Sequence, residues 1–274
     1  MSHGPQTQDA KIAEQKRINE NLDNIKNKIL VISGKGGVGK STTAINIAAS
    51  LSDKGFKVGL MDTDLHGPNT LKMLKLENKQ LLSDGSQIIP LEYNENLKVV
   101  SIAAMMDEQE AAIIWRGPLK ISIIRQFIGD VNWGKLDYLI IDTPPGSGDE
   151  PLTVAQTILK SKAVILTTPQ EISLMDIKRS VDFCKKLNID IIGIIENMSG
   201  FVCPHCKETV EIFKSGGGEK YAKEKDINFL GKIPLEKDIV TASDDGEPFS
   251  LKYKDSKTGK LFSEIINQII DTTK

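Results

Sequence analysis

The sequence at residues 34–42 is Gly34-Lys35-Gly36-Gly37-Val38-Gly39-Lys40-Ser41-Thr42, which fits the phosphate-loop pattern G-x-x-x-x-G-K-[ST]. An apolar run precedes this loop and helical apolar spacing follows it, the context that the pattern requires. The glycines let backbone N–H groups turn toward a phosphate at the positive end of the following helix. We expect Lys40 to reach the β and γ phosphates and the Ser41 hydroxyl to contact Mg²⁺. The flanks argue against an ordinary glycine-rich turn, so residues 34–42 predict a nucleotide site.

Short apolar runs alternate along the chain with longer segments of helical spacing. The runs lie at residues 29–32, 58–61, 97–100, 138–141, 163–166 and 191–195. Continuous apolar strands of this kind are typical of a parallel sheet that helices cover on both faces. The predicted fold class is therefore α/β, a doubly wound and mostly parallel β-sheet flanked by helices, as in P-loop NTPases.

The polar start of the chain differs from the rest. Residues 1–27 are almost entirely polar, and we expect a flexible N-terminal lead-in with at most one weak helix. Residues 28–274 are expected to form one P-loop ATPase domain, with a Cys-x-x-Cys insertion near residues 203–206.

The composition limits the kinds of partner that the protein is expected to bind. The chain has 35 basic and 37 acidic residues, a net charge of -2, so no broad positive field attracts nucleic acid or an anionic membrane. No apolar run reaches the roughly 18 residues that span a bilayer, and the polar start does not suit a signal peptide. Three cysteines are too few for a disulfide framework. We predict a cytoplasmic protein without nucleic-acid or membrane partners.

Three acidic residues stand where predicted strands end: Asp62, Asp64 and Asp142. In a doubly wound sheet, ligands gather at the carboxyl ends of strands, so Asp142 is expected in the Mg²⁺ shell beside the loop. Any one of these acids could be a solvated turn residue or a helix cap. Three of them near a phosphate loop favour a magnesium–nucleotide site. The neighbouring His66 is interpreted as a solvated loop residue without a role.

A second chemical motif is Cys203-Pro204-His205-Cys206. Two thiolates at this spacing can hold one side of a tetrahedral metal or cluster site. The remaining Cys184 lies on an apolar helical stripe and is interpreted as a core residue. A four-thiolate centre would therefore need two copies of the chain, related by a two-fold axis. A zinc half-site completed by His205 or a carboxylate, and a redox dithiol, remain alternatives.

Together these motifs resemble a known family. Residues 35–42 are similar to the deviant Walker A motif of the MinD, ParA and nitrogenase iron-protein group. From about residue 28 to the C-terminal helix, the chain resembles the Mrp/ApbC family of iron-sulfur cluster carrier ATPases. The further segments that carry this resemblance are Asp62-Thr63-Asp64-Leu65-His66-Gly67-Pro68, Trp115-Arg116-Gly117-Pro118, Asp142-Thr143-Pro144-Pro145-Gly146, Glu196-Asn197-Met198-Ser199-Gly200 and the cysteine motif.

The resemblance implies roles for residues around the nucleotide. Lys35 would reach across a homodimer to the nucleotide of the partner subunit, and Lys40 would hold the phosphates of its own. Asp64 would orient the attacking water. Asn197, with the region around Pro234, would hold the adenine.

The resemblance also implies the cargo. Cys203 and Cys206 from both subunits would bridge one [4Fe-4S] cluster, which the ATPase would transfer to apo iron-sulfur proteins. Some relatives hold a second cluster in a cysteine-rich N-terminal extension, but residues 1–27 contain no cysteine. Only the bridging site is therefore expected.

Two other functions stay open on the sequence. A positioning ATPase of the MinD/ParA kind would cycle on membrane or DNA, but the near-neutral charge and the lack of a basic amphipathic C-terminal segment disfavour it. An ATP-dependent electron-transfer protein similar to the nitrogenase iron protein would hold its cluster with single, widely separated cysteines. Here both expected ligands lie in one short motif.

Overall fold

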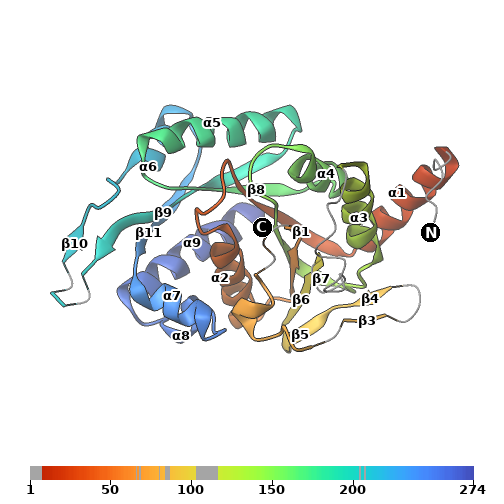
Figure 1. The fold of residues 1–274 in the computed structure, drawn as a ribbon, viewed down its shortest axis with the longest axis horizontal. Coiled ribbons are helices and arrows are strands. Elements are labelled where there is room, and N and C mark those ends of the chain that lie inside the picture. Colours follow the sequence, from red (N-terminus) through yellow and green to blue (C-terminus); the bar gives the residue numbers. More distant parts are fainter. Residues whose placement is uncertain are drawn as a thin grey trace.

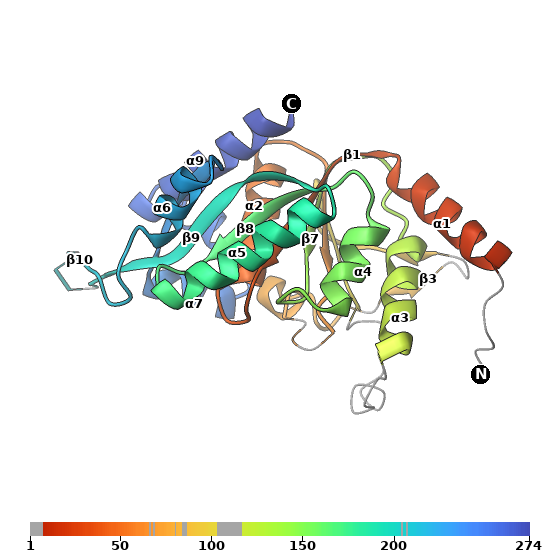
Figure 2. The same ribbon diagram turned by 90° about the horizontal axis from the view of Figure 1, so that it is seen from above.

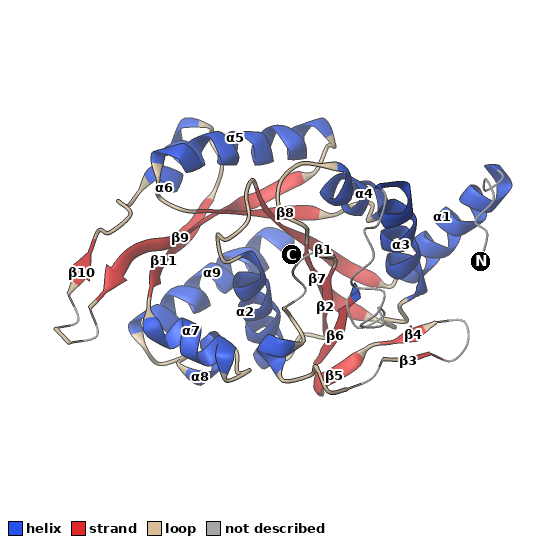
Figure 3. Ribbon diagram, in the orientation of Figure 1, coloured by secondary structure: helices blue, strands red, loops and turns tan. Residues whose placement is uncertain are grey.

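The computed structural model describes residues 8–65, 67, 69–79, 81–83, 87–102, 117–203, 205–206 and 208–274. Its centre is a nine-stranded sheet, in which the order is β10-β9-β8-β1-β7-β2-β6-β5 and β11 pairs with β9 (Figures 1 and 3). The strands are β1 (Ile25–Ser33), β2 (Val58–Asp62), β5 (Leu91–Asn94), β6 (Leu97–Ser101), β7 (Leu136–Asp142), β8 (Lys162–Thr167), β9 (Asp190–Val202), β10 (Thr209–Val210) and β11 (Phe229–Leu235). A separate small sheet pairs β3 (Leu82–Ser83) with β4 (Ile88–Ile89).

The large sheet is mostly parallel, as predicted. β1 lies between β7 and β8, and all three run in the same direction. Among the described residues, only the pairings of β5 with β6 and of β10 with β9 are antiparallel within this sheet. Each of the six predicted apolar runs forms the core of a strand.

Helices cover both faces of the sheet. They are α1 (Gln8–Leu22), α2 (Lys40–Asp53), α3 (Gly117–Asp130), α4 (Asp149–Thr157), α5 (Glu171–Lys186), α6 (Gly217–Glu224), α7 (Lys237–Asp244), α8 (Phe249–Lys252) and α9 (Lys257–Thr273), with a 3₁₀ turn η1 (Lys72–Leu74). Alternate residues of β1 enter opposite cores: Ile29 and Val31 pack with α2 and α9, whereas Leu30 and Ile32 pack with the layer of α1, α3, α4 and α5. Figure 2 shows that layer along one side of the sheet. Burial on both faces explains why the strands are continuously apolar.

From Gln8 on, the N-terminal segment differs from the flexible lead-in expected for residues 1–27, because residues 8–22 form the helix α1. α1 packs against α3, where Ile18 and Leu22 are buried, and Arg17 forms an ion pair of 3.0 Å with Asp130. β1 then begins at Ile25, before the expected domain start at residue 28. Two apolar residues one helical turn apart are enough to seat a helix on a neighbour, although the average composition of the segment is polar.

Some of the motif residues fall outside the part of the chain that the structure describes. They are His66, Pro68, Trp115, Arg116 and Pro204. Within the described residues, no helix has the length and apolar character needed to cross a membrane.

Candidate nucleotide site and cysteine hairpin

The phosphate loop joins the end of β1 to the start of α2 and borders a cavity of about 320 Å³. Gly37 and Gly39 have φ angles of 76° and 83°, which favour glycine, and Gly39 caps α2. The cavity is lined by Ser33, Lys35, Gly36, Gly37, Gly39, Lys40, Ser41, Thr42, Asp64, Gly67, Asn69, Met73 and Pro145. The structure thus brings most of the predicted loop together with Asp64.

Two residues of the predicted loop, Gly34 and Val38, pack against neighbouring parts of the protein. Gly34 lies against the backbone of Asp176 in α5, where a Cβ atom would clash with the carbonyl oxygen. Val38 is buried in the core that α2 shares with β1. Neither residue is among those that line the cavity. Their contact with a nucleotide stays a prediction.

Lys40 and Asp142 meet at the carboxyl end of β7. Lys40 Nζ lies 2.6 Å from Asp142 Oδ1, and both side chains are buried. Burial raises the pKa of Asp142, and the nearby Lys40 and Ser41 oppose that rise. Its second oxygen, Oδ2, is buried without a hydrogen-bond partner among the described residues. An unpaired buried carboxylate oxygen beside a phosphate loop fits a place in the shell of a divalent cation.

Asp62 is one of the three acids expected at strand ends, but the sequence assigns it no role of its own, and in the structure it is buried. The strand register pairs Asp62 with Asp142. Its two oxygens accept hydrogen bonds from Asp64 N at 3.0 Å and Ser101 Oγ at 3.2 Å. Burial raises the pKa of Asp62 to about 7, and the charge of Asp142 adds to this rise. Asp62 therefore holds the backbone of Asp64 at the edge of the cavity.

Lys35 contacts the start of α5 in its own subunit. Its Nζ atom lies 2.8 Å from Ser173 Oγ and 3.4 Å from Gln170 Oε1. The sequence carried no signal for this contact, because more than 130 residues separate the loop from α5. The predicted contact between Lys35 and the nucleotide of a partner subunit stays a prediction.

Asn197 and Pro234 lie on neighbouring strands, because the register of β9 and β11 pairs Asn197 with Ile233, next to Pro234. Asn197 Nδ2 donates a 2.8 Å hydrogen bond to Val38 O in the phosphate loop, and Pro234 is buried. Neither residue is among those that line the cavity. Their contact with adenine stays a prediction.

The two motif cysteines lie on a hairpin that extends from the end of the sheet opposite α1 (Figure 1). Cys203 is half-buried, and its backbone N–H donates to Glu208 O at 2.9 Å. Cys206 is exposed, with its Sγ atom 3.9 Å from Glu208 Oε2. No group of three or more histidine, cysteine or acidic ligands suited to a metal ion occurs in the ranges that the structure describes. The hairpin therefore presents a pair of thiols, as a half-site would.

Cys184 is separate from this pair. It is fully buried in α5 within the core layer of α3, α4 and α5. Burial raises the pKa of its thiol to about 12. This confirms the interpretation of Cys184 as a core residue.

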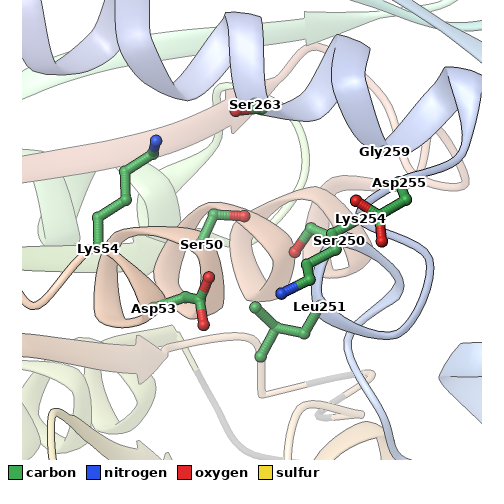
Figure 4. Close-up of a pocket in the computed structure, with 9 residues that line it drawn as sticks. All are labelled: Ser50, Asp53, Lys54, Ser250, Leu251, Lys254, Asp255, Gly259 and Ser263. Carbon is green, nitrogen blue, oxygen red and sulfur yellow. The ribbon is translucent and has the colours of Figure 1, made fainter.

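A second hollow lies between α2, α8 and the start of α9 (Figure 4). It has a volume of about 220 Å³ and is lined by Ser50, Asp53, Lys54, Ser250, Leu251, Lys254, Asp255, Gly259 and Ser263. Two lysines and two aspartates balance in charge, so the hollow favours neither anions nor cations.

Comparison with known sequences extends these observations. A family model described as "ParA: NUBPL iron-transfer P-loop NTPase" matches residues 24–270. The iron-sulfur cluster carrier protein of Methanocaldococcus jannaschii is 49% identical over 97% of this chain and 92% of its own length. The cytosolic Fe-S cluster assembly factor NUBP2 homolog of Dictyostelium discoideum is 47% identical over 86% of this chain and 91% of its own.

Comparison with solved structures points in the same direction as these relatives. A nucleotide-binding protein from Archaeoglobus fulgidus, solved in complex with ADP and with cobalt, is 36% identical and superposes with a TM-score of 0.75 over 85% of this chain and 91% of its own. The MinD cell division ATPase of Pyrococcus furiosus, 22% identical, has a TM-score of 0.67 over 90% of this chain and 99% of its own, which shows a shared fold. The chain thus belongs to the NUBPL iron-transfer family of P-loop NTPases.

Proposed function

We propose that this protein is a homodimeric ATPase that carries a [4Fe-4S] cluster between its two subunits and passes it to apo-proteins in the cytoplasm. The observation that carries the proposal is the hairpin, which presents Cys203 and Cys206 near the surface. Within the described residues, these two thiols belong to no group of three or more histidine, cysteine or acidic ligands suited to a metal ion. Two such hairpins related by a two-fold axis would supply four thiolates. The names of the relatives, iron-sulfur cluster carrier and assembly factor, support this cargo.

The phosphate loop would bind ATP with Mg²⁺. Lys40 would hold the β and γ phosphates, while Ser41 and the unpaired oxygen of Asp142 would face the cation. Mg²⁺ would neutralise charge that develops on the phosphates during hydrolysis. Asp64, held at the cavity edge, would orient the attacking water.

Lys35 would couple the nucleotide to the dimer. Its ammonium group is now held by neutral oxygens of Ser173 and Gln170. The γ-phosphate of a nucleotide in the partner subunit would attract this cation more strongly than a hydroxyl and an amide do. ATP binding would therefore tighten the dimer, and hydrolysis would relax it.

Anaerobic reconstitution with iron and sulfide tests the cargo. We expect about four iron atoms per two chains and a dimer mass by native mass spectrometry. Cys203→Ser and Cys206→Ser should lose the cluster and keep ATP binding, because neither cysteine is among the residues that line the cavity. Cys184→Ser is the matched control, since Cys184 is buried elsewhere. Absence of iron, or one cluster per single chain, would contradict the proposal.

Transfer to a clusterless [4Fe-4S] enzyme tests the role of ATP. We expect ATP to change the rate of transfer and Lys35→Ala to remove this effect. Equal rates with and without ATP, for the unmodified protein, would show that hydrolysis serves another purpose.

A further inference from the structure

Two consecutive residues in the middle of β9, Glu196 and Asn197, contact the two different sites of the molecule. Asn197 contacts the phosphate loop through the carbonyl oxygen of Val38. Its neighbour Glu196 turns to the other side of the strand and contacts both ends of the segment 199–218, which carries the cysteine hairpin. One dipeptide thus joins the nucleotide site to the hairpin.

The Glu196 carboxylate is fully buried and accepts three hydrogen bonds. Oε1 accepts from Ser199 Oγ at 2.5 Å, at the start of the segment 199–218, and from Gly216 N at 2.8 Å, near the end of that segment. Oε2 accepts from Gly218 N at 2.6 Å in the first turn of α6. A buried carboxylate is costly unless it is hydrogen-bonded, so these three donors fix its position.

The C-terminal end of the segment 199–218 is shaped to accept the Glu196 carboxylate. Gly216 has a φ of 88° and caps α6, whose positive end favours an anion. A Cβ atom on Gly218 would lie 3.0 Å from Thr167 Cγ2 and 3.2 Å from Glu196 Oε2, closer than side chains usually pack. Ser199 and Ser215 also bond to each other at 3.0 Å. Glu196 therefore closes the base of the cysteine segment.

The side chain of Asn197 also packs closely against the phosphate loop. A Cβ atom on Gly39 would clash with the Asn197 amide nitrogen. Met198 follows with a φ of 57°, a conformation that is uncommon for a residue with a side chain. The contact of Asn197 with the loop and the contact of Ser199 with Glu196 are thus separated by a single residue.

We propose that Glu196 is a positioning residue for the cluster ligands, and that the Glu196–Asn197 dipeptide transmits the nucleotide state of the phosphate loop to Cys203 and Cys206. This inference rests on the proposed function for its purpose. Its structural claim, that nucleotide binding changes the cysteine hairpin through Glu196, can be tested on protein without a cluster.

Glu196→Gln is the test variant, because it keeps the shape of the side chain but removes the charge. Glu219→Gln is the matched control: Glu219 lies in the first turn of the same helix but is exposed and pairs with Lys232 at 2.7 Å. Ser199→Ala is a milder second variant that removes one of the three donors and keeps the assay available if Glu196→Gln does not fold.

The measurement is the alkylation rate of Cys203 and Cys206 in cluster-free protein, with and without Mg²⁺ and a non-hydrolysable ATP analogue, followed by peptide mass spectrometry. Amide hydrogen exchange of residues 199–218 provides a second readout. We expect the analogue to change both readouts about fivefold or more in the unmodified protein and in Glu219→Gln. In Glu196→Gln and Ser199→Ala this response should shrink, while the affinity for the analogue stays within about twofold.

Three outcomes would overturn the inference: no response in the unmodified protein, an undiminished response in Glu196→Gln, or an equal loss in Glu219→Gln. Failure of the unmodified protein to bind a cluster on reconstitution would instead contradict the proposed function. The two failures are therefore distinguishable.

Discussion

Lys40 Nζ lies 2.6 Å from Asp142 Oδ1, and the protein excludes both groups from solvent. The pair joins the first residue of α2 to the last residue of β7 across 102 positions of sequence. A nucleotide that binds the loop would bring phosphate oxygens to the same ammonium group. Nucleotide binding would then give the Lys40 ammonium a second anionic partner and would change the electrostatic environment of Asp142 at the same time.

Lys40→Ala should lower the free energy of unfolding by about 3 kcal/mol, because it leaves a buried carboxylate without its partner. It should also abolish ATP binding. Urea unfolding and calorimetric titration measure the two effects.

Lys26→Ala is the control for that variant. Lys26 pairs with Asp137 at the same 2.6 Å distance, but its side chain is 74% exposed. The expected loss is much smaller than for Lys40→Ala, since solvent screens the pair. Equal losses for Lys26→Ala and Lys40→Ala would contradict the assignment of a buried pair at the loop.

Gly39→Ala should destabilise the protein more than Gly37→Ala. Both glycines have positive φ angles, so each substitution carries a backbone cost of about 1–2 kcal/mol. Only the Cβ at position 39 would also displace the Asn197 side chain, because nothing lies within 4 Å of a Cβ at position 37. Adding Asn197→Ala should recover part of the loss in Gly39→Ala and none in Gly37→Ala. Urea unfolding of the single and double variants tests this, and additive effects would exclude the contact.

Ile18→Ala should lower the free energy of unfolding by about 2–5 kcal/mol if α1 belongs to the cooperative fold. Ile18 is fully buried beside Gly129 of α3, whereas Ile12 on the same helix is 61% exposed. Ile12→Ala should therefore change stability by less than about 0.5 kcal/mol. If thermal unfolding midpoints of both variants match the unmodified protein, α1 is a detachable segment.

Two of the three thiols should react with iodoacetamide at pH 8. Burial raises the pKa of Cys184 to about 12, which means that the folded protein favours its neutral form. At pH 8, about four units lower, only about one Cys184 thiol in ten thousand is ionised, and the thiolate is the reactive species. Peptide mass spectrometry should find Cys203 and Cys206 modified, and all three cysteines modified in denaturant. Fast modification of Cys184 in the folded protein would show that its core opens.

Much of the architecture could be predicted from short stretches of sequence. The apolar runs that became β1, β2, β6, β7, β8 and β9 are long enough to mark strands buried on both faces, and the glycine pattern of residues 34–42 is a local chemical requirement. The packing of α1 against α3 could not be predicted in this way. Its contact depends on the position of Ile18 opposite Gly129, while its average composition is polar.

The cysteine pair and the nucleotide loop could be identified from their residues because each lies in one short motif, where spacing along the chain sets spacing in space. The residues that contact those motifs in the fold could not be identified in this way. Asp62 beside Asp142, Lys35 on Ser173, and Glu196 beneath the cysteine hairpin all join segments that only the folded sheet brings together. Burial and packing, which depend on the whole chain, set the charge environment of Asp62 and the position of the hairpin. The local chemistry could therefore be predicted from the sequence, whereas the contacts of Glu196 and Asn197 were visible only in the fold.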